Sequence, residues 1–233
     1  MPKLKKSHDI IHQLVKESID ELAAHFLKNP YFFYTENDLH CHLFNIIFKK
    51  FESHELNKPI ETSDGKSSIL LHKEYPTKAQ YRRNEAGKLQ KVEKGRKGRR
   101  GHFDLCIWNP DLVNKKLFRS EGGSDEQETF IAIELALNED MDKDNKLIHL
   151  KNDYKKLTDK ENGVDQGYIL HLIRTEELSK TLQNRLPELR KNIDEFKQNL
   201  DQKVKFLYLE TNKPNKKPKF ISSKNWAPMA RWD

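Results

Sequence analysis

The sequence predicts an α/β domain with a mixed central β-sheet flanked by helices. Some segments carry apolar residues every three or four positions, which is typical of helices, and others alternate apolar and polar residues, which is typical of strands. The order of these segments is the third observation. Two helices are followed by three hairpin-like strands and then by a strand–helix–strand unit, whose crossover is expected to be right-handed.

Two helices are predicted before the first strand, at residues 8–28 and about 35–52. Pro30 stops the first helix because proline cannot continue the backbone hydrogen bonding. The threonine that opens the second range is a preferred N-cap residue. Glu36 and Asp38 then fall in the first turn, where acidic side chains suit the helix dipole.

The remaining elements alternate along the chain. Strands are predicted at residues 68–75, 102–108, 129–137, 168–173 and 204–209. Helices are predicted at residues 144–160 and 176–200, the second with an interruption near Pro187. We expect one domain over residues 1–233, with a flexible loop or loose hairpin arm at about 78–101 and a basic C-terminal extension at about 211–233.

Positive charge is concentrated in one segment. The chain has a net charge of +7, and residues 78–100 alone hold ten basic and two acidic side chains. A solvated loop is the plainer interpretation, but this imbalance favours contact with a polyanion, and nucleic acid, with DNA as the expected form, is the partner we predict. The expected contact residues are Arg82, Arg83, Arg96, Lys97, Arg99 and Arg100.

Neither a disulfide framework nor a membrane span is predicted. Cys41 and Cys106 both lie in apolar surroundings, and no apolar run approaches the roughly 20 residues that a transmembrane helix needs. The first residues also lack the apolar core of a signal peptide. We therefore expect a cytoplasmic protein without a membrane partner, and a homodimer is compatible with the sequence.

Two predicted strands each carry one carboxylate among small or apolar neighbours. Alternation places Asp104 on one face of residues 102–108 and Glu134 on one face of residues 129–137. Each carboxylate could pair with an arginine of the basic segment or face solvent. Together, however, two such carboxylates favour a divalent cation between them, because an unpartnered charge inside a sheet is costly.

The run at residues 100–108 (RGHFDLCIW), followed by residues 131–136 (IAIELA), resembles the second and third motifs of the PD-(D/E)XK nuclease superfamily. The resemblance covers about residues 35–175 and implies a restriction-endonuclease-like core. It implies that Asp104 and Glu134 bind Mg²⁺, with Mn²⁺ as an alternative. It also implies that Glu36 (or Asp38) and Glu74 complete the metal shell.

One position departs from the pattern of this superfamily. The lysine expected two residues after Glu134 is replaced by Ala136. In some members a neighbouring helix supplies the lysine, and here the helix at 144–160 offers Lys146, Lys151, Lys155 and Lys156. Lys151 flanks the apolar stripe of that helix, so we expect it to reach Glu134 and to act as the catalytic cation. Alternatively the lysine is absent and the domain binds DNA without cutting it.

The function predicted from the sequence is that of a metal-dependent nuclease that hydrolyses phosphodiester bonds in DNA. The alternatives are an inactive nucleic-acid-binding module of the same fold and a protein–protein adaptor. The cluster His40-Cys41-His42 is not expected to bind a metal, because helical residues two apart point about 200° away from each other. Ordinary packing and surface placement are expected for these three residues.

Overall fold

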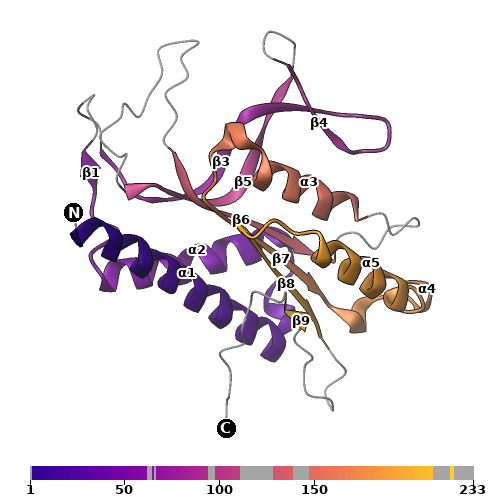
Figure 1. The fold of residues 1–233 in the computed structure, drawn as a ribbon. Coiled ribbons are helices and arrows are strands. Elements are labelled where there is room, and N and C mark those ends of the chain that lie inside the picture. The colour runs from indigo at the N-terminus through magenta and orange to yellow at the C-terminus, as the bar shows by residue number, and fades with distance from the viewer. Residues whose placement is uncertain are drawn as a thin grey trace.

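A computed structural model describes residues 2–61, 65, 67–93, 98–110, 128–138, 147–211 and 221–222. A mixed central sheet is covered on one face by α1 and α2 and on the other by α3 and α5 (Figure 1). The α/β class and the sheet flanked by helices are therefore confirmed. Within the described part of the chain, no helix is both long enough and apolar enough to cross a membrane.

The helices and strands follow the predicted order, with short additions. The helices are α1 (Pro2–Lys28), α2 (Glu36–Ser53), α3 (Ile148–Thr158), α4 (Lys180–Gln183) and α5 (Leu186–Gln198). The strands are β1 (Ile60–Glu61), β2 (Ser67–Ser68), β3 (Leu71–Arg83), β4 (Leu89–Lys91), β5 (Arg99–Trp108), β6 (Thr129–Leu137), β7 (Gln166–Ile173), β8 (Val204–Glu210) and β9 (Ile221–Ser222). Short 3₁₀ turns lie at η1 (Pro30–Phe32), η3 (Lys160–Asn162) and η4 (Thr175–Glu177).

The main sheet changes from antiparallel to parallel pairing at β6. Its strand order is β4-β3-β5-β6-β7-β8-β9, and β1 and β2 form a separate ribbon. β3 pairs antiparallel with β5, and β5 pairs antiparallel with β6. β6, β7 and β8 are parallel neighbours, because helices carry the chain back between them. All nine residues of β6 are buried, as expected for a central strand covered on both faces.

The helical layer of α1 and α2 is predicted from the sequence, although α1 begins at Pro2, earlier than expected. The apolar stripe of α1 is buried (Ile11, Leu14, Val15, Ile19, Leu22 and Phe26). Thr35 caps α2: its hydroxyl accepts a hydrogen bond from the Asp38 N–H at 3.3 Å, and the Asp38 carboxylate accepts one from the Thr35 N–H at 2.7 Å. This reciprocal pair satisfies two backbone donors and fixes the start of α2.

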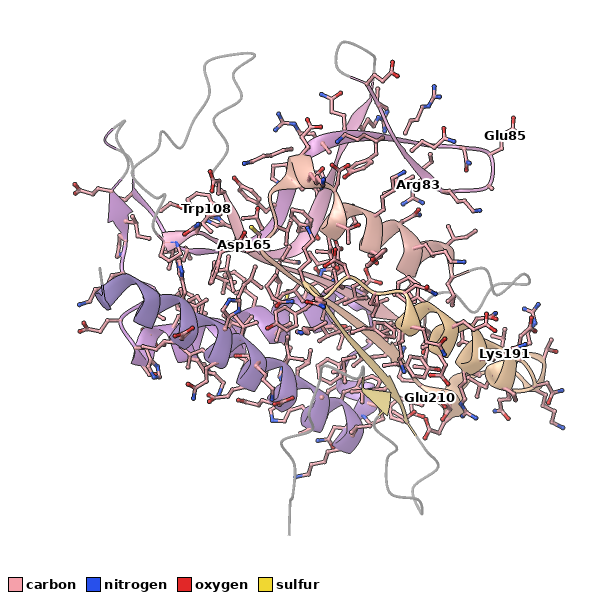
Figure 2. All side chains as sticks on the ribbon, in the orientation of Figure 1. Arg83, Glu85, Trp108, Asp165, Lys191 and Glu210 are labelled. Carbon is pink, nitrogen blue, oxygen red and sulfur yellow. The ribbon has the colours of Figure 1, made fainter. Side chains whose placement is uncertain are left out.

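The basic segment is a hairpin arm rather than a flexible loop over its described residues. β3 continues to Arg83, turns at Gly87 with a φ of +74°, and returns as β4. Asn152 of α3 anchors the arm: its side-chain oxygen accepts from the Leu89 N–H at 2.8 Å, and its side-chain nitrogen donates to the Gly87 carbonyl at 3.1 Å. Figure 2 shows Arg83 and Glu85 on this projecting arm. Residues 94–97 lie outside the described residues.

Candidate metal and phosphate site

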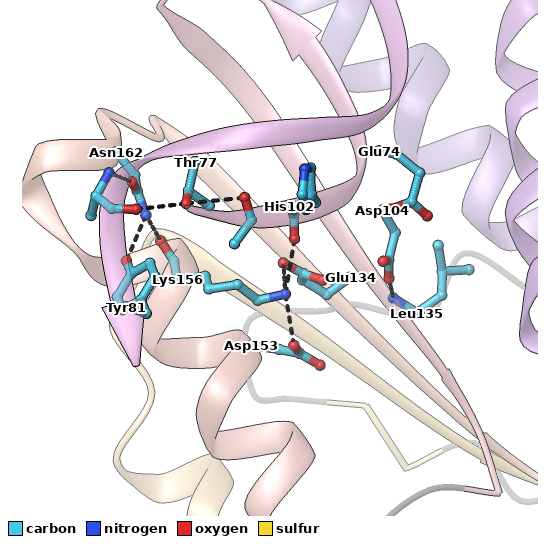
Figure 3. A network of polar contacts seen from close by, with 12 residues as sticks. Glu74, Thr77, Tyr81, His102, Asp104, Glu134, Leu135, Asp153, Lys156 and Asn162 are labelled. Atoms are coloured by element: carbon cyan, nitrogen blue, oxygen red, sulfur yellow. Dashed lines mark hydrogen bonds and ion pairs between the residues drawn. The ribbon is translucent and has the colours of Figure 1, made fainter. Parts of the chain in front are cut away.

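The candidate site forms where β5 and β6 stop pairing. Their ladder runs from Trp108↔Thr129 to Leu105↔Ile133, so Asp104 and Glu134 come just after its last pair. The Leu135 N–H beyond the ladder donates to the Asp104 carboxylate at 2.7 Å. Because a buried backbone donor needs a partner, this bond holds Asp104 against β6. Figure 3 shows both carboxylates in this region of the sheet.

A cluster of potential metal ligands surrounds His40 of α2. Its Nε2 atom lies 3.4 Å from the Asp104 carboxylate and 3.7 Å from that of Glu36, and its Nδ1 atom lies 3.7 Å from that of Glu74. One ligand atom each from Glu36, His40 and Asp104 fall within 4.8 Å of one another. The His40 side chain is only 6% exposed, and neither ring nitrogen makes a hydrogen bond of good geometry. Since buried polar atoms normally have partners, these three residues are candidates to hold a cation.

Glu74 reaches this cluster through an unusual backbone conformation. Its neighbours Lys73 and Tyr75 pair with Leu105 and Phe103, so the register sets Glu74 opposite Asp104. Its φ is +52°, in the left-handed region, which costs about 1–3 kcal/mol for a residue other than glycine. Such strain is concentrated at functional sites in proteins, and here it accompanies a carboxylate that faces the buried imidazole.

The charges in the cluster shift one another. Burial favours the neutral ring of His40, but Asp104, Glu36 and Glu74 together raise its pKa above the usual value. Burial would raise the pKa of Asp104, but His40 and the Leu135 N–H outweigh it and lower that pKa. Without a cation the cluster therefore favours a protonated imidazole, which supplies the positive charge that the carboxylates require.

A second group, next to the first, is centred on Lys156 of α3. Its ammonium lies 2.7 Å from the Glu134 carboxylate and 3.0 Å from that of Asp153, and it donates to the His102 carbonyl at 3.1 Å (Figure 3). Burial would lower the pKa of Lys156, but Glu134 and Asp153 raise it, so the side chain keeps its proton. Burial raises the pKa of Glu134, which Lys156 only partly offsets. Asp104 interacts electrostatically with both residues, so the two groups form one site.

Lys156, and not Lys151, is the cation that contacts Glu134. The two lysines are five positions apart, or about 140° around the helix, so they occupy different faces of α3. Lys151 is exposed, whereas only 12% of the Lys156 side chain is exposed. The expectation failed because the apolar stripe does not show how the helix turns against the sheet: Leu150 and Leu157 are buried and carry Lys156 toward β6.

No family model, curated protein or solved structure matches this chain.

A basic cavity adjoins the Lys156 group. It has a volume of about 900 Å³ and lies between the hairpin arm, β5 and α3. Four of the arginines predicted to contact nucleic acid line it: Arg82, Arg83, Arg99 and Arg100. Lys156 and His102 also line it, so the cavity reaches the ammonium that contacts Glu134. Arg96 and Lys97 lie outside the described residues.

Of the predicted metal ligands, Asp104, Glu36 and Glu74 lie around His40, whereas Glu134 contacts Lys156 and is not part of that cluster. His40, Asp153 and Lys156 complete the two groups. His40 and His42 do face different partners, since His42 pairs with His25 at 3.0 Å. Packing or surface placement was expected for His40, and its ring lies beside the carboxylates of Glu36 and Asp104. Glu36 and His40 are four residues apart and therefore share a helix face, and this spacing is the signal that was missed.

Proposed function

We propose that this protein is a metal-dependent nuclease that hydrolyses phosphodiester bonds in DNA, with a restriction-endonuclease-like core of the PD-(D/E)XK type. The observation that carries the proposal is the buried Lys156 ammonium held by Glu134 beside the cluster of Glu36, His40 and Asp104. This ammonium supplies a positive charge beside Glu134, which compensates for Ala136 at the position where the superfamily has a lysine. The order of elements also agrees with the resemblance: an acidic helix, an Asp strand, a Glu strand and a Lys-bearing helix.

The residues present fit a divalent cation. Asp104 and Glu36 offer carboxylate oxygens and His40 offers an imidazole nitrogen, while Glu74 is placed to complete the shell. Oxygen ligands alone would favour Mg²⁺, but an imidazole ligand suits Mn²⁺ and other transition metals better. When bound, such a cation would lower the pKa of a coordinated water and neutralise charge on the phosphate.

Lys156 would act as a fixed positive charge. Because its pKa is raised, the ammonium is not suited to remove a proton from water. Its three N–H groups already contact Glu134, Asp153 and the His102 carbonyl, so its role would be electrostatic: its positive charge would stabilise the negative charge that grows on the phosphate as the bond breaks. Glu134 and Asp153 hold the ammonium in position from two sides.

The arginine-lined cavity would bind the substrate backbone. Guanidinium groups bind phosphate oxygens with paired hydrogen bonds, and such contacts position nucleic acid without reading its sequence. Since the cavity extends to Lys156, a strand lying along Arg99 and Arg100 would bring one phosphate to the carboxylates. The alternatives are an inactive DNA-binding module, favoured by Ala136, and a protein–protein adaptor.

The experiment that tests the proposal is cleavage of labelled duplex, single-stranded and branched DNA with Mn²⁺, Mg²⁺ or a chelator. We expect cleavage with Mn²⁺ that the chelator abolishes and that Asp104→Asn removes. Binding without cleavage on every substrate would favour the inactive module. If neither binding nor cleavage occurs, the adaptor is the better interpretation.

A further inference from the structure

Three large aromatic side chains are exposed on one turn. Tyr31, Phe32 and Tyr34 are 59%, 75% and 83% exposed, and they are the large hydrophobic side chains that stand out in this way among the described residues. They lie in and directly after η1, the turn that joins α1 to α2. Aromatic rings are normally at least partly buried, so three exposed rings within four residues indicate a binding surface.

The turn that carries these rings is held firmly. Phe33, between them in sequence, is buried and packs on Phe26 and His42 at ring distances of 6.0 and 5.2 Å. Arg174, at the end of β7, is also buried and donates to the Phe33 carbonyl at 2.9 Å and to the Tyr34 carbonyl at 3.5 Å. The backbone is thus fixed from the inside while the rings face solvent. A surface presented in this way loses little conformational entropy when it binds a partner.

The aromatic turn adjoins the cluster around His40. Tyr34 immediately precedes the Thr35 cap, and Glu36 in the next position belongs to the cluster. The arginine-lined cavity approaches the same site from Lys156 and the hairpin arm instead. Figure 1 shows the α1–α2 layer and the β3–β4 arm at different ends of the molecule. The carboxylates therefore lie between a basic surface and an aromatic one.

We propose that Tyr31, Phe32 and Tyr34 form a stacking platform for unpaired bases next to the phosphate that is cleaved. This inference rests on the proposed nuclease function and narrows its substrate to single strands or to strands with unpaired nucleotides. Stacking on an aromatic side chain requires a free base face, which the interior of a duplex does not offer. A stable protein interface buries about 800 Å² on each partner, far more than a turn of four residues presents.

Binding of short oligonucleotides to the full chain tests this proposal, with a chelator present so that no cleavage occurs. The probes are an oligo(dT) that contains one fluorescent 2-aminopurine, an abasic oligonucleotide of equal length and charge, and a blunt duplex. We expect wild-type protein to bind oligo(dT) more tightly than the abasic probe and to change the 2-aminopurine fluorescence. The variant Phe32→Ala/Tyr34→Ala should bind oligo(dT) roughly five- to a hundredfold more weakly and bind the abasic probe unchanged.

Two control variants separate this proposal from the proposed function. Phe32→Trp/Tyr34→Phe keeps the rings and should retain binding, whereas Arg99→Ala/Arg100→Ala should weaken binding of all three probes. If the alanine variant binds oligo(dT) like wild type while the arginine variant loses binding, the platform is wrong and the nuclease proposal stands. If the alanine variant instead changes the oligomeric state and not nucleotide binding, the rings serve a protein contact and the proposal is overturned.

Discussion

At the scale of single residues, the site depends on which side chains are buried and what they contact. Lys156 and His40 are both buried beside carboxylates, but their surroundings differ. Lys156 has close partners in Glu134, Asp153 and the His102 carbonyl, whereas the His40 ring nitrogens have only carboxylate oxygens at 3.4–3.7 Å. The first arrangement fixes a charge, whereas in the second a divalent cation could replace the proton that the carboxylates favour on His40.

Replacement of Lys156 should show which of the two lysines of α3, Lys151 or Lys156, contributes to cleavage. We expect Lys156→Ala to lower the cleavage rate at least about a hundredfold, because it removes a preorganised charge from the site. Lys151→Ala is the matched control on the exposed side of the same helix and should cleave like wild type. The measurement is single-turnover cleavage with Mn²⁺. Loss of cleavage in Lys151→Ala alone would return the catalytic role to Lys151.

Replacement of His40 should change the metal preference. We expect wild-type protein to bind Mn²⁺ more tightly than Mg²⁺, and His40→Phe to weaken Mn²⁺ binding at least about tenfold because it removes the nitrogen ligand and keeps the volume. His42→Phe, on the same helix but outside the cluster, should leave it unchanged. Calorimetric titration of each protein checks this. Equal Mn²⁺ affinity in both variants would exclude His40 from the metal shell.

At the scale of secondary-structure elements, packing determines contacts that the pattern of apolar residues in the sequence does not reveal. His8 and His12 of α1 contact the start of β6, since the centres of their rings lie 4.5 and 4.6 Å from that of Phe130. Burial first, and then the neighbouring His8, lower the pKa of His12, while Asp9 and Asp165 oppose this. We therefore expect the packing of α1 against β6 to depend on pH.

The contribution of His12 to stability should be lost in acid. A histidine whose pKa is lower in the folded state than in the unfolded chain stabilises the fold above its unfolded pKa of about 6.5 and loses that contribution as the pH falls below it. We expect His12→Phe to lose less stability than wild type between pH 7.5 and 5.5, and His54→Gln, at an exposed position, to follow wild type. Urea unfolding at both pH values, in a chelator, measures this. Identical losses in all three proteins would contradict the prediction.

How far the sequence predicts each element depends on how local its cause is. The stripe of α1 and the Thr35 N-cap are local, and both were predicted correctly, although the reciprocal bond of Asp38 was not. The hairpin arm was only partly predicted, because its strands are polar and are held by Asn152 from a distant helix. Likewise Lys156 could not be chosen over Lys151 from periodicity, since the rotation of α3 against the sheet is a tertiary property.

At the scale of the whole molecule, charge is separated across the surface of the fold. The arginines gather in the cavity between the arm and α3, whereas the acidic side chains Glu36, Glu74 and Asp104 gather where α2 meets the sheet. A polyanion that approaches this surface is attracted by the arginines. Near the carboxylates it is repelled unless a cation neutralises them. Binding should therefore depend on salt through the arginines and on the divalent metal through the carboxylates.

Removal of two cavity arginines should reduce the salt dependence of DNA binding. We expect Arg99→Ala/Arg100→Ala to flatten the slope of log affinity against log salt by up to about 0.9 for each lost phosphate contact on duplex DNA. Lys180→Ala/Lys191→Ala removes the same charge from exposed positions on α4 and α5 and should leave the slope unchanged. Fluorescence anisotropy at several salt concentrations measures both. Equal flattening by the two variants would show that only net charge matters.

The cluster around His40 takes its ligands from two layers of the fold, Glu36 and His40 from a helix and Asp104 from the sheet. A cation held there would cross-link those layers, so that separating them would require releasing the ion. At a free metal concentration one hundred times the dissociation constant, this linkage is worth about 2.7 kcal/mol.

Mn²⁺ should then slow amide hydrogen exchange in α2 and around Asp104 more than in α5, and Asp104→Asn should abolish the difference. Uniform slowing throughout the chain would show that the ion does not join these layers. In contrast, selective slowing would show that the bound metal holds α2 against the sheet. The availability of the metal would then determine how often the α2 layer opens.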